Sequence, residues 1–238
     1  MLSVIIPAYN EEKTIGELLD IVFKVKPKKE VIIINDGSFD NTEKIIKKID
    51  LLYQNNPSLY PNLNNLQIVN KKNEGKGSAL RNGFKLAKGE IILIQDADLE
   101  LDPNEYSKLL QPFESMNADI VFGSRFMEKN PSNKNIFFLG NKILTKISNL
   151  FTGIKMTDME TCYKVFKKEI IDSIDIKSKG FCVEPELAAY TGKAVKNGKK
   201  FFEIPISYFP RTKEMGKKIN YWDGVKAIIC IIRYNLFS

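Results

Sequence analysis

Three carboxylates follow a short apolar stretch near the middle of the chain. In the sequence EIILIQDADLELDP, the apolar residues 91–94 predict a buried strand, and Asp96, Asp98 and Glu100 come after it at every second position. Side chains alternate across an extended chain, so these carboxylates are expected to point to one side. Carboxylates crowded in a poorly solvated cleft repel one another unless a cation lies between them, and hard oxygen ligands favour Mg²⁺ or Mn²⁺ over zinc. The spacing therefore predicts a divalent metal site.

Acidic residues after a strand can also have a purely structural role, because they form turns and cap helices. Here Asp102 and Pro103 provide a separate helix start, which favours the metal interpretation of the D-x-D spacing. The chain contains no histidine. Ser-His-Asp and Cys-His catalysis and His-dependent zinc sites are therefore excluded, and the chemistry must come from carboxylates, lysines, arginines or a metal.

Basic residues are concentrated in the segment 192–218 of a chain whose formal net charge is +7. This segment has eight lysines and arginines against two glutamates. Such a cluster attracts phosphates, so nucleic acid, anionic lipid, a phosphorylated small acceptor and a merely solvated basic surface all remain open. Zinc-finger spacing and an RNP-like aromatic run are missing from the sequence, so we expect no nucleic-acid partner.

Cysteine usage and hydropathy indicate a protein of the cytoplasm. Cys162, Cys182 and Cys230 are odd in number, far apart and without a CxxC pair, and we interpret them as free thiols in a reducing cytosol. The N-terminus has no basic region and only a short apolar run, which is not typical of a signal peptide. No stretch approaches the roughly 20 apolar residues that are needed to span a bilayer. We therefore expect any membrane contact to be peripheral.

Apolar strands and amphipathic helices alternate along the chain and must position these side chains. The expected strands are 2–6, 31–34, 66–69, 90–95, 119–122 and 201–208. With helices between the first five, this order predicts an α/β fold with a mostly parallel sheet, in which ligands bind at the carboxyl ends of the strands. The polar clusters at these ends are 8–11, 36–38, 74–76 and 96–100. At 238 residues, the chain fits one large domain.

Two later stretches, 136–151 and 225–237, are rich in apolar residues but too short to span a bilayer. The first has the spacing of an amphipathic helix, and both packing on the core and lying on a bilayer fit that pattern. Both stretches therefore belong to the C-terminal part of the fold as amphipathic elements.

Known nucleotide-binding motifs are incomplete or missing. Gly75 and Gly77 follow a predicted strand, but the third glycine of a dinucleotide-binding turn is absent, and the sequence has no Walker loop. A D-x-D pair at a strand end of a parallel sheet indicates instead a metal-bridged diphosphate, which is the leaving group of a nucleotide sugar.

A succession of motifs resembles the family 2 glycosyltransferases, specifically the group of dolichyl-phosphate mannosyltransferase and dolichyl-phosphate glucosyltransferase. The motifs are SVIIPAYNEE, INDGS, NEGKGSALRNGF, DADLE, FGSRF, DMETCYKVFKKE, FCVEPE, and EIPISY with GKKI. The resemblance covers essentially the whole chain and implies a single nucleotide-sugar-binding domain of the GT-A, Rossmann-like type. It assigns residues 1–125 to the nucleotide sugar and residues 126–238, with their amphipathic helices, to an acceptor at the cytoplasmic face of a membrane.

The resemblance also implies roles for individual residues. The nucleotide sugar would contact Pro7, Tyr9, Glu11, Asp36, Lys76, Asp96, Ala97, Asp98 and Arg125. The metal, Mg²⁺ or Mn²⁺, would be held by Asp96, Asp98 and Glu100. The catalytic set would consist of Asp98, Arg125, Arg211, Lys217 and Lys218. The last three would hold the acceptor phosphate or close over the diphosphate.

The implied reaction is an inverting transfer of a hexose to dolichyl or undecaprenyl phosphate, with GDP-mannose and UDP-glucose both open as donors. A phosphate acceptor is already an anion near neutral pH and needs no strong base, which suits a chain without histidine. A glycan or soluble hydroxyl acceptor is the alternative and would need a carboxylate base. The carboxylates expected near the sugar, or as helix caps, are Asp158, Glu160, Glu184 and Glu186. A third possibility is a catalytically inactive module that binds lipid or nucleic acid through its basic segment.

Overall fold

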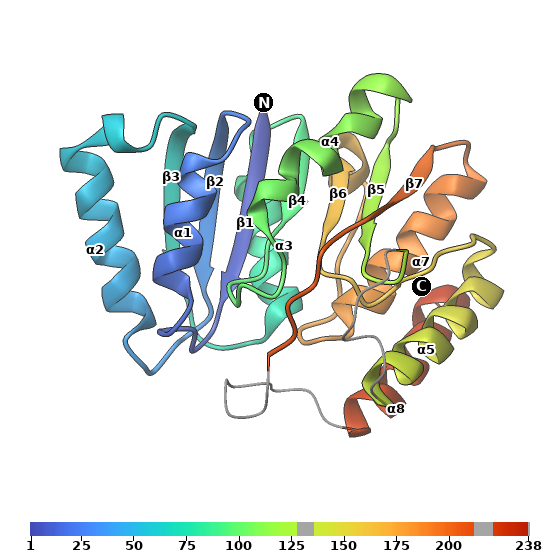
Figure 1. Cartoon of the computed structure of the whole chain (residues 1–238). Coiled ribbons are helices and arrows are strands. Elements are labelled where there is room, and N and C mark those ends of the chain that lie inside the picture. Colours follow the sequence, from blue (N-terminus) through green and yellow to red (C-terminus); the bar gives the residue numbers. More distant parts are fainter. Residues whose placement is uncertain (128–135, 212–220, 238) are drawn as a thin grey trace.

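A single mixed β-sheet runs through the molecule, with helices on both faces (Figure 1). The structure is a computed structural model that describes residues 1–127, 136–211 and 221–237. Its seven strands lie in the order β3-β2-β1-β4-β6-β5-β7. Because strands from both halves of the chain share this sheet, the α/β single-domain prediction is confirmed, whereas the boundary expected at residue 125 stays a prediction.

The first half of the sheet is parallel, as the sequence predicts. The elements in chain order are β1 (Leu2–Ala8), α1 (Ile15–Lys24), β2 (Lys29–Asn35), α2 (Thr42–Asn55), η1 (Pro57–Leu59), β3 (Leu63–Asn70), α3 (Lys76–Leu86) and β4 (Ile91–Ile94). Strand β1 pairs in parallel with β2 and β4, and β2 pairs in parallel with β3. The carboxyl ends of these strands therefore lie along one edge of the sheet.

The second half of the sheet contains a strand that runs against its neighbours. The elements are η2 (Pro103–Glu105), α4 (Tyr106–Ser115), β5 (Ile120–Ser124), α5 (Ile136–Thr152), β6 (Lys164–Lys167), α6 (Lys168–Asp172), α7 (Val183–Lys196), β7 (Phe201–Pro205) and α8 (Tyr221–Leu236). Strand β6 is antiparallel to both β4 and β5. The residues that precede β6 therefore lie at the same edge as the residues that follow β4.

Strand β1 continues through Pro7 to Ala8, beyond the expected strand 2–6. β4 pairs with β1 only as far as Ile5. Beyond that point β1 pairs with β2 alone, so the missing N–H of Pro7 leaves no unpaired acceptor in β4. The following helix begins at Ile15, and the carbonyl of Glu11 before it accepts hydrogen bonds from the N–H groups of Thr14 and Ile15.

The core consists of two apolar layers, one on each face of the sheet. On β1, Val4 and Ile6 pack in the layer under α1, α2 and α4, whereas Ile5 between them packs in the layer with α3 and α7. All three side chains are fully buried. This alternation places both faces of a strand in apolar surroundings, which explains why the strands are continuous runs of Ile and Val.

Helices α5 and α8 lie side by side at the far end of the sheet from α2 (Figure 1). Each buries part of one face, with Leu144 on α5 and Ile231 on α8 in the core. Other apolar side chains on these two helices are exposed, namely Leu139, Ile143, Leu150, Val225, Ile229, Ile232 and Leu236. We call these seven side chains the α5–α8 apolar face. Within the described residues, no helix has the length and apolarity needed to cross a membrane.

Cys182 and Cys230 form a disulfide, so our interpretation of all three cysteines as free thiols was wrong for two of them. The bond connects the residue before α7 to the middle of α8, with the Cα atoms 5.8 Å apart. The two residues are 48 positions apart, and only the packing of α7 against α8 brings them together. Cys162 is a free thiol, as expected.

Candidate active site

A cavity of about 400 Å³ opens at the edge of the sheet where β1, β2 and β4 end. The sequence-predicted residues that line it are Pro7, Tyr9, Glu11, Asp36, Lys76, Asp96, Ala97, Asp98, Glu100, Arg125 and Arg211. Lys217 and Lys218 lie outside the described residues. Side chains separated by about 200 positions therefore share one cavity, and their individual roles stay predictions.

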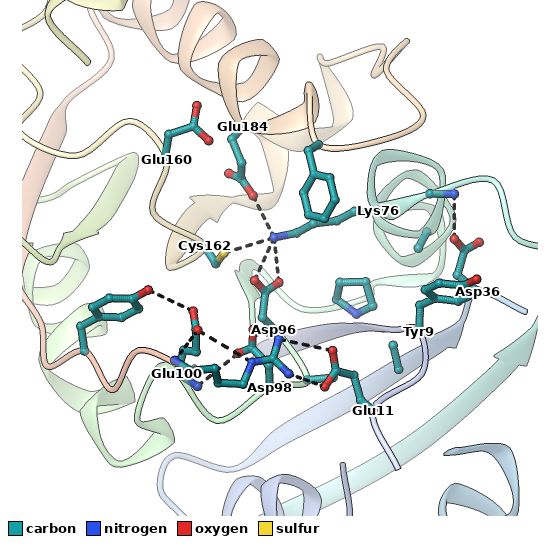
Figure 2. Close-up of a pocket in the computed structure, with 18 of the residues that line it drawn as sticks. Tyr9, Glu11, Asp36, Lys76, Asp96, Asp98, Glu100, Glu160, Cys162 and Glu184 are labelled. Carbon is teal, nitrogen blue, oxygen red and sulfur yellow. Dashed lines mark hydrogen bonds and ion pairs between the residues drawn. The ribbon is translucent and has the colours of Figure 1, made fainter. Parts of the chain in front are cut away.

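Arg211 is the cation that holds the acidic loop after β4. Its guanidinium lies 2.8 Å from an oxygen of Glu11 and 3.0 Å from an oxygen of Asp98. Its backbone N–H donates to Glu100 over 2.8 Å, and the Tyr208 hydroxyl donates to the other oxygen of Glu100. The three carboxylates come from two different strand ends, so Arg211 joins the loop after β1 to the loop after β4 (Figure 2).

The three carboxylates after β4 do not point to one side, because the chain turns instead of staying extended. Leu99 has a φ of 60°, and this turn directs Asp98 and Glu100 toward Arg211 while Asp96 faces Lys76. Burial, with repulsion from Asp96 and Glu100, raises the pKa of Asp98 to about 7 despite the nearby Arg211. The loop therefore holds more negative charge than its surroundings neutralise.

The donor set suits Mg²⁺ or Mn²⁺ as a partial ligand shell. In the described part of the chain, no group of three acidic or cysteine side chains could hold a metal by itself. Asp98 and Glu100 nevertheless face a single shared cation, Arg211. The atoms that they could offer to a metal are carboxylate oxygens, which are hard ligands. Mg²⁺ is commonly bound by one or two carboxylates together with substrate phosphates, and this arrangement fits that mode.

Lys76 is the second cation of the site and lies at the centre of a buried network (Figure 2). Its ammonium is 2.7 Å from Asp96, 2.9 Å from Glu184 and 3.2 Å from the sulfur of Cys162. Burial alone would raise the pKa of Asp96, but the charge of Lys76 brings it below its usual value. Lys164 binds the other oxygen of Glu184, so Glu184 lies between two lysines.

The glycines of NEGKG allow two loops to approach each other closely. Gly75 has a φ of +93°, which favours glycine, and its N–H donates to Asp36 over 2.7 Å. A Cβ on Gly77 would lie 2.4 Å from the carbonyl oxygen of Ser178. Asp36 also binds Lys71 at 2.6 Å. Asp36 therefore fixes the turn that precedes α3 as well as lining the cavity.

Arg125 is held by Asp158, which is fully buried. Two guanidinium nitrogens donate to the two oxygens of Asp158 over 2.7 and 2.8 Å, a bidentate pair that fixes the plane of the arginine. The guanidinium also lies 5.1 Å from the centre of the Tyr208 ring. Asp158 thus orients Arg125 and does not line the cavity itself.

Of the four carboxylates expected near the sugar, Glu160 and Glu184 line the cavity, and Asp158 and Glu186 do not. Glu186 is buried and accepts hydrogen bonds from the backbone N–H groups of Lys177 and Ser178. Its role is therefore to fix the segment before α7, as a helix-start residue would.

Several cavity residues were missed by the sequence analysis. They are Asn73, Gly75, Ala79, Phe126, Phe138, Asn141, Cys162, Phe181 and Tyr208. Phe126 and Tyr208 stand inside or next to motifs that we had noted, FGSRF and EIPISY, so a closer reading of those motifs could have found them. Cys162 and Phe181 likewise stand inside noted motifs, DMETCYKVFKKE and FCVEPE. Phe138 and Asn141 stand outside every noted motif, because their place in the cavity depends on the packing of α5.

The family model described as Glycosyl transferase family 2 matches residues 3–175. The chain belongs to glycosyltransferase family 2. The matched part contains most residues that line the cavity. The lining residues outside it are Phe181, Glu184, Tyr208 and Arg211. The resemblance stated from the motifs is therefore confirmed at the level of the family.

Three relatives cover nearly the whole chain of this glycosyltransferase. An uncharacterized protein of Methanocaldococcus jannaschii is 32% identical over 99% of this chain and 93% of its own. The polyprenol monophosphomannose synthase of Mycolicibacterium smegmatis is 26% identical over 90% of this chain and 79% of its own. The dolichyl-phosphate beta-glucosyltransferase ALG5A of Trichomonas vaginalis is 27% identical over 99% of this chain and 73% of its own.

Solved structures share the fold of this glycosyltransferase. The glucosyl-3-phosphoglycerate synthase of Mycobacterium tuberculosis, in a crystal structure with Mn²⁺, UDP-glucose and glycerol 3-phosphate, superposes with a TM-score of 0.69 at 18% identity. The match covers 99% of this chain and 80% of that protein. The GT-A type of architecture is therefore confirmed.

Proposed function

We propose that this protein transfers a hexose, mannose or glucose, from a nucleotide sugar to a polyprenyl phosphate, with inversion and with Mg²⁺ or Mn²⁺. The names of two relatives support a polyprenyl or dolichyl phosphate acceptor. These names differ in the sugar, one being a mannosyl and the other a glucosyl enzyme, so GDP-mannose and UDP-glucose are both candidate donors.

The observation that carries this proposal is the meeting of the β4 carboxylates with two arginines in one cavity. Asp98, with Asp96 and Glu100, would hold the metal, which when bound supplies positive charge beside the departing diphosphate. Arg125 has a fixed orientation, and in our proposal it adds positive charge where negative charge accumulates on the leaving group.

The nucleoside would lie at the end of the cavity lined by the loops after β1 and β2. Pro7, Tyr9, Glu11 and Asp36 line this end. The ring of Tyr9 packs edge-on against Phe39, with ring centres 6.1 Å apart, and its position is thereby restricted. We propose that these four residues contact the base and ribose, and that Lys76 and Ala97 contact the nucleotide sugar further along.

The acceptor phosphate needs positive charge more than it needs a base. Its second ionisation lies near pH 6, so it is already an anion that can attack at neutral pH. We propose that Arg211, Lys217 and Lys218 hold this phosphate or the departing diphosphate. Arg211 is well placed for either task, because it already lies against Asp98 in the cavity.

A membrane surface would deliver the acceptor. Phe138 and Asn141 on α5 line the cavity, and the same helix contributes Leu139 and Ile143 to the α5–α8 apolar face. A helix with one apolar exposed face and lysines such as Lys142 beside it favours the surface of an anionic bilayer. We propose that the protein binds peripherally to the cytoplasmic face of a membrane through this surface.

A hydroxyl acceptor is the second candidate, and Glu160 favours it. Burial and the nearby Glu184 raise the pKa of Glu160 to about 7, which is suitable for a general base. Glu184 is a weaker candidate, because it is bound by Lys76 and Lys164. A carboxylate base is needed only if the acceptor is an alcohol.

A competition assay tests the proposal. Purified protein with Mg²⁺ or Mn²⁺ is given an equal mixture of UDP-glucose and GDP-mannose, with and without a short polyprenyl phosphate, and the products are identified by mass spectrometry. We expect one nucleoside diphosphate and one glycosyl phospholipid, both dependent on the lipid, and a loss of at least roughly 100-fold in turnover for Asp98→Asn. Turnover that survives Asp98→Asn intact contradicts the proposal. Binding of a nucleotide without any lipid-dependent product supports the second candidate.

A further inference from the structure

We infer that Glu160 is a specificity-determining residue that accepts hydrogen bonds from hydroxyl groups of the donor hexose. The inference rests on the proposed function and names the part of the donor that the residue contacts.

Glu160 has a buried oxygen atom with no partner. Its Oε1 is shielded from solvent and finds no hydrogen-bond donor within the part of the chain that the structure describes. The other acidic side chains of the cavity are engaged: Glu11, Asp98 and Glu100 with Arg211, Asp96 and Glu184 with Lys76, and Asp36 with Lys71. A buried carboxylate oxygen without a donor is costly, so its retention in a cavity indicates that a ligand supplies the donor.

The nearest cations of the protein are already committed elsewhere. Lys164 donates to Glu184 and to the carbonyl oxygens of Met159 and Thr161. Arg125 is occupied by its bidentate pair with Asp158. Among the described residues, Glu160 is therefore part of no ion pair, and a purely structural role does not explain its place in the lining of the cavity.

The position of Glu160 matches the sugar end of a nucleotide sugar. Figure 2 shows Tyr9 and Asp36 at one end of the cavity, Asp96 in the middle, and Glu160 beside Glu184 at the other end. With the nucleoside at the first end and the diphosphate at the metal-binding loop, the hexose is the next group in the molecule.

The charge at this end favours a neutral ligand over an anionic one. Burial and the nearby carboxylate of Glu184 raise the pKa of Glu160, which means that further negative charge beside it is disfavoured. A phosphate would add that charge, whereas sugar hydroxyls are neutral and donate hydrogen bonds. The occupant expected beside Glu160 is therefore the hexose and not the acceptor phosphate.

The experiment separates sugar binding from nucleotide binding. Binding of UDP and of GDP is first measured by calorimetry in the presence of Mg²⁺. Binding of the corresponding nucleotide sugar, UDP-glucose or GDP-mannose, is then measured in the same way. Wild type is compared with Glu160→Ala and Glu160→Gln, and with Glu169→Gln as a control that removes the same charge from an exposed ion pair with Lys199.

We expect Glu160→Ala to weaken binding of the nucleotide sugar by about tenfold or more, Glu160→Gln by severalfold, and neither to change binding of the nucleoside diphosphate by more than about twofold. Equal losses for both ligands, or no loss for either, would overturn the inference. If a Glu160 variant binds the nucleotide sugar like wild type but loses turnover in the product assay, Glu160 is a general base instead. If wild type binds neither UDP nor GDP, the proposed function itself fails and this inference with it.

Discussion

At the scale of single residues, the site depends on Arg211 and Lys76, which balance the carboxylates at the strand ends. Arg211 is largely buried and contacts carboxylates from two loops, so its removal leaves Glu11, Asp98 and Glu100 to repel one another. The two cations thus neutralise separate parts of the acidic cluster, Arg211 on one side and Lys76 beside Asp96 on the other.

Arg211→Gln should lower the free energy of unfolding of the metal-free protein by about 1–3 kcal/mol, because buried carboxylates lose their shared cation. Added Mg²⁺ should recover most of this loss, since a divalent cation can replace the missing charge. Urea denaturation with and without Mg²⁺ measures both effects. Arg233→Gln, an exposed position on α8, serves as the control. A variant as stable as wild type without metal would contradict the prediction.

Glu160 should make stability depend on pH. Its pKa is raised from 4.5 to about 7 in the folded protein. Between pH 4.5 and pH 7, Glu160 is therefore ionised in the unfolded chain but still protonated in the folded protein. The contribution of Glu160 to stability is therefore fully present below about pH 4.5 and is lost as the pH rises to 7. Glu160→Gln should exceed wild type in unfolding free energy by roughly 1–2 kcal/mol at pH 8 and should differ little at pH 4.5. Denaturation series at the two pH values check this, and parallel curves would disprove it.

The polar residues of the cavity were predictable to the extent that a parallel sheet determines their place. Tyr9, Asp36 and Asp98 follow strands and Pro7 lies near the end of β1, and the rule that ligands bind at the carboxyl ends of strands brings them together. The pairing of Lys76 with Glu184 was not predictable. It depends on the approach of the segment before α7 to the glycines of NEGKG, which only tertiary packing determines.

At the scale of secondary-structure elements, α5 and α8 combine a buried face in the core with an exposed apolar face. Leu144 and Ile231 lie in the core, whereas Leu139 and Ile229 are more than half exposed. The sequence predicted both apolar stretches but could not choose between packing on the core and lying on a bilayer, because an amphipathic pattern fits both. In the structure, α5 and α8 each bury one face in the core and expose the other to solvent.

A double variant, Leu139→Asp with Ile229→Asp, should reduce binding to vesicles of phosphatidylglycerol and phosphatidylcholine by at least roughly tenfold, because each charge would have to enter the bilayer interface. Co-sedimentation measures the binding. Leu51→Asp on α2 is a matched control, since Leu51 and Leu139 are each 58% exposed and α2 lies at the opposite end of the sheet. Equal effects of both changes would argue against a specific membrane-facing surface.

Most helices and strands were predictable, and the antiparallel β6 was not. Its sequence KVFK has lysine at two of four positions, and a strand in the middle of a sheet is normally apolar on both faces. Lys164 is nevertheless fully buried, because carbonyl oxygens and Glu184 satisfy its ammonium. Hydropathy alone cannot reveal such a strand.

At the scale of the whole molecule, the disulfide closes a large loop. Cys182→Ser with Cys230→Ser should lower the free energy of unfolding by about 3–4 kcal/mol, because a bond across 48 residues restricts the unfolded chain. Reductant should destabilise wild type by a similar amount and leave the double variant unchanged. Thiol labelling of the native protein should modify no cysteine but Cys162, and labelling of all three would contradict the bond.

The reversed direction of β6 has a consequence for how such a protein can diverge. One end of the cavity is lined by residues at or after the ends of parallel strands, such as Tyr9 and Asp36, whereas Glu160 and Cys162 come from the segment that precedes the antiparallel β6. Substitution of Glu160 therefore alters the end of the cavity beside Glu184 and leaves the segments after β1 and β2 unchanged. We expect the two ends to diverge separately, so exchanging residues 159–162 between relatives, with Asp158 kept to hold Arg125, should alter the preference for the sugar.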